Sequence, residues 1–175
     1  MGMMNLWHCF MYLCLIGILG FFIGRILPKG WFHPDGILFR TCAFEKNGTI
    51  YNRLKVKRWM NKVPDMSRIL PGMMPPKSLS PGIGPKQLDL AIRETCIAEF
   101  VHLALGLLGF FCVLIWEGIG GRILALLYLI GNLPYIIIQR YNRPKLMRVA
   151  ERLREKESIK ESHEEEGKEC TKQAL

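Results

Sequence analysis

The sequence lacks the short motifs by which the common soluble enzyme classes are recognised. It contains no glycine-rich phosphate or dinucleotide loop and no nucleophile elbow of a Ser-His-Asp hydrolase. None of its four histidines is followed five residues later by aspartate, a familiar acyltransferase signature; these are His8, His33, His102 and His163. Neither kinase nor dinucleotide-dependent oxidoreductase chemistry therefore has support, and His33, beside Pro34 and Asp35, is at most a minor candidate.

The sequence also lacks a cysteine framework. Its six cysteines are scattered and no two have the spacing of a metal site or a redox motif: Cys9, Cys14, Cys42, Cys96, Cys112 and Cys170. We therefore expect no metal site, no disulfide scaffold and no resident cofactor. Most of these cysteines are expected to serve as small apolar residues.

Apolar residues are abundant: they make up 50% of the chain, and the mean hydropathy is +0.15. A helix that crosses a bilayer needs about 20 such residues, and three runs predict such helices, at about 7–27, 92–116 and 122–139. The expected fold is all-α: an integral membrane protein with three transmembrane helices, a long basic loop (28–86) and a charged C-terminal helix. We expect one membrane-embedded domain (1–166) and a disordered tail (167–175). The first run lacks a basic start and a small-x-small cleavage site, which favours an uncleaved anchor.

The net charge of +9 raises nucleic acid as a partner, but the basic residues follow the apolar runs. Most lie in the loop 28–86 or follow Arg140, whereas the turn between the second and third runs carries only Arg122. By the positive-inside rule, the N-terminus lies outside the cell membrane, and the loop 28–86 and the C-terminus are cytoplasmic. We attribute the charge to this topology and to membrane lipid, and expect no nucleic-acid partner.

The basic loop contains three segments with patterns of their own. Residues 37–44 lie between turn signals and are expected either to be extended or to lie flat on the membrane. Residues 50–63 combine Trp59 with basic residues such as Lys57, so they either anchor the loop passively at the headgroups or cradle an anionic acyl donor. Residues 64–85 are rich in proline and predict a linker or a mobile lid.

Polar residues and glycines recur inside two of the apolar runs at steps of three and four, so each set shares one helix face. The second run has Thr95, Glu99, His102, Gly106 and Gly109. The third run has Tyr128, Asn132, Tyr135 and Gln139. If the two helices pack antiparallel, the polar faces meet in the cytoplasmic half of the membrane. The glycines either admit a neighbouring backbone or leave a groove for a lipid chain.

His102 and Glu99 are the strongest candidates for chemistry. A charged side chain in mid-membrane costs roughly 2.5–3.5 kcal/mol, so such residues usually face the protein interior or a substrate path. At a spacing of three, Glu99 is placed to orient His102, and histidine is the usual general base for moving an acyl group to an alcohol. The alternative is that the pair only holds helices together.

A set of residues spread from about Arg25 to Arg148 resembles the glycosyl-4,4'-diaponeurosporenoate acyltransferases, membrane enzymes of staphyloxanthin-type carotenoid synthesis. The most specific part is the run 138–144, Ile-Gln-Arg-Tyr-Asn-Arg-Pro. The other residues that carry the resemblance are Phe44, Glu45, Lys46, Gly48, Asn52, Val56, Lys57, Trp59, Ala98, Glu99, His102, Asn132 and Pro134. The sequence departs from the family pattern at Met60 and in the proline-rich residues 66–85.

The resemblance implies a membrane acyltransferase that esterifies a sugar hydroxyl, the glucose 6-position, of a glycosyl carotenoid with a fatty acyl group from acyl-CoA or acyl carrier protein. We then expect His102 as the base and Glu99 as its orienting partner. Asn132 and Gln139 are expected to position the acceptor or the thioester. The other predicted substrate-binding residues are Arg140, Asn142, Arg143, Trp59 and Lys57.

Other interpretations remain open from the sequence. Arg140 and Arg143 either grip a donor phosphate or an anionic lipid, or serve only as positive-inside anchors. The protein as a whole has two alternatives to the carotenoid acyltransferase: a non-enzymatic membrane interaction protein, and a membrane lipid transferase that acts on another glycolipid.

Overall fold

The computed structural model describes residues 2–43, 45, 49–64 and 84–173, with side chains up to residue 163, and every regular element in this part is helical. Phe44, Lys46 and Gly48 of the resemblance, and most of the proline-rich segment expected as a linker or lid, lie outside the described residues. The elements are α1 (Gly2–Ile26), η1 (Lys29–Trp31), α2 (Thr49–Arg53), α3 (Val56–Trp59), η3 (Met60–Lys62), α5 (Pro85–Leu108), η4 (Gly109–Phe111), α6 (Cys112–Ile115) and α7 (Ile119–Gln173).

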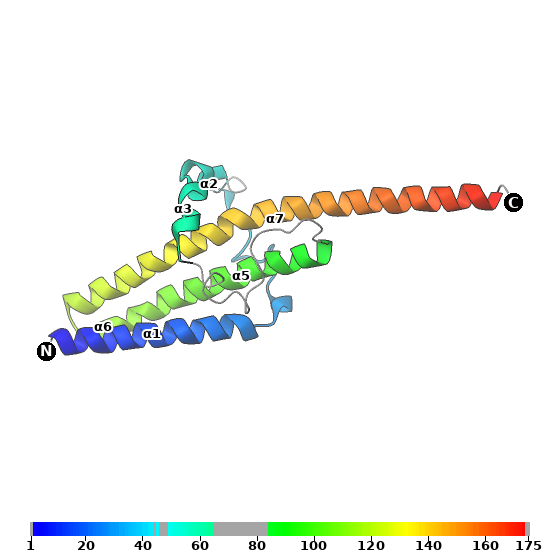
Figure 1. Ribbon diagram of the computed structural model, residues 1–175. Coiled ribbons are helices and arrows are strands. Elements are labelled where there is room, and N and C mark those ends of the chain that lie inside the picture. The colour runs from blue at the N-terminus through cyan, green and yellow to red at the C-terminus, as the bar shows by residue number, and fades with distance from the viewer. Residues whose placement is uncertain (1, 44, 46–48, 65–83, 174–175) are drawn as a thin grey trace.

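Three helical segments are long and apolar enough to cross a membrane: Gly2–Ile26, Pro85–Ile115 and Ile119–His163. Figure 1 shows α1, α5 and α7 lying side by side, with α7 continuing well beyond the other two. The predicted all-α membrane architecture with three spans is confirmed. Helix α7 is helical to Gln173 and contains two prolines, Pro134 and Pro144. The division into a domain at 1–166 and a tail at 167–175 stays a prediction.

The α6–α7 turn depends on one glycine. Gly118 has φ +102°, a conformation that is costly for residues with a Cβ. Across this turn, the ring of Trp116 lies against Gly120 and its carbonyl oxygen lies against Gly121. The short turn makes α5–α6 and α7 antiparallel neighbours, which is the arrangement that the two polar faces require.

The glycines of the second run allow close packing between helices. Leu129 fills the space above Gly106, and the ring of Tyr128 lies over Gly109. Gly20 of α1 is approached in the same way by Leu105. Of the two expectations for the glycine face, close approach is therefore the one observed, and side chains of α7 occupy the place of the lipid groove.

The described residues between 28 and 63 fold against the middle of α5 and the middle of α7. Phe32 and Phe39 pack on Cys96 and Ile97 of α5. The described part of the segment 37–44, residues 37–43, is a series of turns and not an extended strand, and its position flat on the membrane stays a prediction. Its buried Phe39 fixes it to the bundle.

Helices α2 and α3 cover α7 from the side (Figure 1). Tyr51 and Val56 form a buried cluster with Ile138 and Tyr141, and Trp59 packs on its edge. Lys55, at φ 51°, separates the two short helices. The apolar side of the amphipathic segment 50–63 therefore faces α7, which offers it an apolar surface at Ile138 and Tyr141. The sequence had predicted that this side contacts the membrane headgroups.

We expect Gly109→Ala to destabilise the bundle, because the added Cβ would lie 2.6 Å from a ring carbon of Tyr128. The free energy of unfolding should fall by about 1–3 kcal/mol, the usual cost of overpacking. Thermal unfolding of the purified protein in detergent measures this. Gly131→Ala is the matched control, since nothing lies within 4 Å of its added Cβ. Equal unfolding midpoints for the two variants would contradict the close packing of α5 on α7.

Candidate functional site

The polar faces of α5 and α7 meet, as their spacing predicted. Passing away from the α6–α7 turn, His102 of α5 lies against Asn132, and Glu99 and Thr95 then lie against arginines of α7. The site therefore has two parts. We call the first the imidazole–amide pair (His102 and Asn132) and the second the arginine network (Arg140, Arg143 and their partners).

The hydrogen bonds of the imidazole–amide pair show which nitrogen of the imidazole carries a proton. The side-chain Nδ2 of Asn132 donates to the carbonyl oxygen of Tyr128 at 2.9 Å, so its Oδ1 faces α5. This Oδ1 lies 2.9 Å from Nδ1 of His102. Because an amide oxygen can only accept, Nδ1 carries the proton, and in the neutral ring Nε2 is the basic nitrogen.

Tyr135 completes the surroundings of the imidazole. Its ring stacks on that of His102 with centroids 4.4 Å apart and an interplanar angle of 10°. The amide of Asn132 holds the ring at its edge and Tyr135 holds it at its face. Together they leave the imidazole little rotational freedom, as a positioned acid–base group requires.

Glu99 is 3% exposed and engages two arginines. Its Oε1 accepts from Nε of Arg140 at 2.7 Å, and its Oε2 accepts from Nη2 of Arg143. A carboxylate buried among apolar helices needs such partners, because an unpaired buried charge is very costly. Nδ1 of His102 donates to Oδ1 of Asn132, whereas the sequence analysis expected Glu99 to orient the imidazole.

Arg140 joins three parts of the chain. Besides Glu99, its guanidinium donates to Oε1 of Glu45 at 2.6 Å and to the carbonyl oxygen of Leu38 at 2.8 Å. Glu45 is 1% exposed and also accepts from the hydroxyl of Tyr51 and, at 2.8 Å, from the N–H of Cys42. Burial works to raise the pKa of Glu45, but these hydrogen bonds outweigh it and hold the pKa below its usual value, so the side chain is ionised.

Arg143 is 2% exposed and, like Arg140, is held by several hydrogen bonds. It donates to Oγ1 of Thr95 at 2.9 Å, to the carbonyl oxygens of Phe39 at 2.6 Å and Thr95 at 3.3 Å, and to Glu99. The two arginines thus tie α7 to α5, to the turns at 38–39 and to Glu45. The sequence alone did not indicate this structural role.

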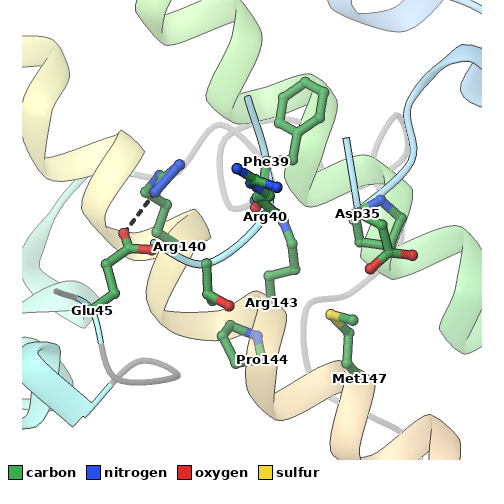
Figure 2. Close-up of a pocket in the computed structure, with 10 residues that line it drawn as sticks. Asp35, Phe39, Arg40, Glu45, Arg140, Arg143, Pro144 and Met147 are labelled. Atoms are coloured by element: carbon green, nitrogen blue, oxygen red, sulfur yellow. Dashed lines mark hydrogen bonds and ion pairs between the residues drawn. The ribbon is translucent and has the colours of Figure 1, made fainter. Parts of the chain in front are cut away.

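A pocket of about 70 Å³ lies beside the arginine network, between the turns at 34–41 and α7 (Figure 2). Arg140 and Arg143 line one side and the exposed Arg40 another. In Figure 2 the dashed ion pair between Glu45 and Arg140 marks its edge. This pocket and the network lie farther from the α6–α7 turn than the imidazole–amide pair.

The remaining predicted residues lie around this core. Gln139 and Asn142 are half-buried on α7. The indole of Trp59 donates to the carbonyl oxygen of Leu54 at 3.2 Å while its ring packs on the Tyr51 cluster, and Lys57 is exposed on α3. Their roles in substrate binding stay predictions.

Two residues of the network had no role in the sequence analysis. Glu45 belonged to the resemblance, but nothing in its surroundings indicated a partner 95 residues away at Arg140. Tyr51 lies in the segment 50–63, for which no polar contact was predicted, yet its hydroxyl donates to Glu45. Burial, and then this hydrogen bond, raise the pKa of Tyr51. The one signal was an acidic residue within a largely basic loop.

The family model for glycosyl-4,4'-diaponeurosporenoate acyltransferase matches residues 28–152, which is more than half of the chain. The chain belongs to this acyltransferase family. Two relatives of that name come from Staphylococcus aureus. The relative from strain Newman is 28% identical over 153 residues, which cover 85% of this chain and 89% of the relative. The relative from strain N315 is 29% identical over 143 residues, which cover 79% of this chain and 83% of the relative. No solved structure matches.

The match confirms the resemblance drawn from the sequence. The matched residues begin after α1 and end in α7 beyond Pro144. They therefore include the imidazole–amide pair, the arginine network and the pocket of this acyltransferase.

We expect Glu99→Gln to reduce the free energy of unfolding of the acyltransferase by about 3–5 kcal/mol, because it removes the charge that two buried guanidiniums share. Glu94→Gln is the matched control. Glu94 pairs with Lys29 at 2.7 Å, but both side chains are about a third or more exposed, so its loss should cost about 1 kcal/mol or less. Thermal unfolding in detergent measures both, and similar losses would argue against an anchoring role for Glu99.

Proposed function

We propose that this membrane acyltransferase esterifies a sugar hydroxyl of a glycosyl carotenoid with a fatty acyl group from a thioester donor. Its relatives are named for acyl transfer to glycosyl-4,4'-diaponeurosporenoate. Family membership supports the reaction class. The observation that carries the assignment of the site is the 2.9 Å contact of His102 Nδ1 with Asn132 Oδ1, which makes Nε2 the basic nitrogen.

In this proposal Nε2 of His102 takes the proton of the sugar hydroxyl as its oxygen attacks the thioester carbon. A tetrahedral intermediate forms, the C–S bond breaks, and the new C–O ester bond remains. The imidazolium then returns the proton to the departing thiolate, so that the products are the ester and a free thiol. Asn132 acts by holding the tautomer and Tyr135 by holding the ring plane.

Glu99 receives a different role from the one expected for it. Its carboxylate fixes Arg140 and Arg143, and through them the turns at 38–39, while Asn132 orients the base. We retain Gln139 and Asn142 as groups that contact substrate, because both are half-buried on α7 near the arginine network. Trp59 and Lys57 of α3 are proposed to contact the donor from the side.

The proposed depth of the site suits an amphipathic acceptor. Asn132 lies eight residues from Arg140, which is about 12 Å along the helix, so the base lies just inside the hydrocarbon while the arginines lie at its border. A sugar at that border leaves its polyene in the membrane. Since α7 fills the space above Gly106 and Gly109, the polyene lies on the lipid-exposed side chains of the helices, such as Leu107 and Leu133.

We further propose that the N-terminus and the α6–α7 turn lie outside the cell membrane, with residues 28–64 and the end of α7 in the cytoplasm. In a background with serine at Cys14, Cys42 and Cys170, Glu117→Cys should react with a membrane-impermeant maleimide in intact cells. Lys57→Cys should react only after permeabilisation, because both positions are exposed but on opposite sides. The reverse labelling pattern would refute this orientation.

His102→Ala should lower the rate of acyl transfer by about 10²–10⁴-fold, the usual contribution of a general base. The measurement is ester formation by purified protein in nanodiscs, with a glycosyl carotenoid acceptor and an acyl thioester donor. His163→Ala, at an exposed position of α7 beyond the bundle, is the control and should retain full activity.

Thermal unfolding of the same His102→Ala protein separates catalysis from helix packing. Preserved stability with lost product supports the base, whereas lost stability with preserved turnover of the folded protein would show that His102 only joins α5 to α7.

A further inference from the structure

We propose that the pocket beside the arginine network binds the phosphate of a phosphopantetheine thioester, the donor chemistry shared by acyl-CoA and acyl carrier protein. This inference rests on the proposed function, because it names the donor of that reaction. It places the phosphate beside the middle of α7, where Arg140 and Arg143 lie, and the thioester carbon at the imidazole–amide pair. Four features of the structure support it.

The first feature is the size and lining of the pocket. Its volume, about 70 Å³, accommodates a few water molecules or one phosphate group. Three arginines face it, Arg40, Arg140 and Arg143, against two carboxylates, Asp35 and Glu45. A compact anionic group such as a phosphate therefore fits the pocket.

The second feature is that the arginines are held in place before a ligand arrives. A guanidinium has five N–H groups, and the bonds of Arg140 to Glu99, Glu45 and Leu38 use three of them. Fixed guanidiniums bind phosphate with little loss of side-chain freedom. Arg40 is exposed at the mouth and brings a further guanidinium to the same pocket.

The third feature is the balance of charge. Glu45 accepts from Tyr51, Cys42 and Arg140, so its charge is already shared among donors. Asp35 is the exposed carboxylate of the lining, and its negative charge repels a phosphate bound in the pocket. Removing the charge of Asp35 should therefore tighten phosphate binding, and removing that of Arg40 should weaken it.

The fourth feature is length. Arg143 lies eleven residues beyond Asn132 on α7, which is about 16 Å at 1.5 Å per residue. A phosphopantetheine arm has about fourteen bonds from phosphorus to the thioester carbon. At ~3.5 Å for every three bonds of an extended chain, it also spans about 16 Å. An extended arm is thus as long as the rise along α7 from Arg143, which lines the pocket, to Asn132, which bonds to His102.

The chemistry is that of the proposed function. The sugar oxygen forms the new C–O bond, the C–S bond breaks, and the proton passes through His102 to the thiolate of phosphopantetheine. The arginines remain bound to the phosphate throughout and take no part in the proton transfer.

Binding is tested first without any acyl transfer. Coenzyme A should raise the thermal unfolding midpoint of the protein in nanodiscs, and pantetheine, which lacks phosphate, should not. Arg40→Gln should weaken coenzyme A binding about tenfold, the typical effect of losing one charge-assisted contact, and Asp35→Asn should strengthen it. The control of equal charge change is Arg122→Gln, at an exposed position by the α6–α7 turn, and it should bind as the wild type does. Equal binding of coenzyme A and pantetheine, or equal effects of Arg40→Gln and Arg122→Gln, would overturn the proposal.

Kinetics then distinguishes the possible donors. With acyl-CoA or acyl carrier protein, Arg40→Gln should raise the KM for the donor about tenfold and leave the KM for the acceptor unchanged. The better of the two donors identifies the natural source, and either outcome supports the pocket. Equal KM values for acyl-CoA and acyl-pantetheine in the wild type would refute it. Coenzyme A binding without ester formation from any thioester would instead refute the proposed function and leave the pocket intact.

Discussion

The structure depends on how one buried carboxylate is neutralised. Glu99 lies between helices whose outer surfaces are apolar, and Arg140 and Arg143 each donate to one of its oxygens. An unpaired charge in such a place would cost several kcal/mol, so the arginines must reach it and α7 must lie where they can. The remaining N–H groups of these arginines then require acceptors, and Glu45, Thr95 and the carbonyls of the turns at 38–39 supply them. The fold of residues 28–63 follows in large part from this demand.

This arrangement separates two tasks that share one helix face. The charged residues hold one part of the bundle together, while the imidazole–amide pair lies closer to the α6–α7 turn, where Nδ1 of His102 donates to an amide oxygen. The separation has a physical advantage. If a buried carboxylate oriented the base, the charges around that carboxylate would have to rearrange during the reaction. An amide that fixes the tautomer remains neutral throughout. Close packing at Gly106 and Gly109 brings α5 near enough to α7 for the 2.9 Å contact to form.

The buried core of the protein is small, and many large apolar side chains on α1, α5 and α7 are exposed. In water such a surface would aggregate, but between lipids it is the expected exterior of a membrane bundle. The buried clusters lie between helices and under the loop, so the specificity of the fold comes from glycine contacts and polar bonds and not from a large apolar core.

The sequence by itself determined the class, the three spans, the antiparallel pair and the shared polar faces, because helical periodicity and hydrophobic length are local properties of the chain. It also placed His102 opposite Asn132, since spacing along two antiparallel helices fixes depth. Only the tertiary structure decided which polar group bonds to which. Glu99 lies three residues from His102 in sequence, yet two arginines more than 40 residues away complete its hydrogen bonds. The partner of a buried charge is the nearest group that can neutralise it in space, and the loop that brings Glu45 to Arg140 carries no periodic signal from which that meeting could be predicted.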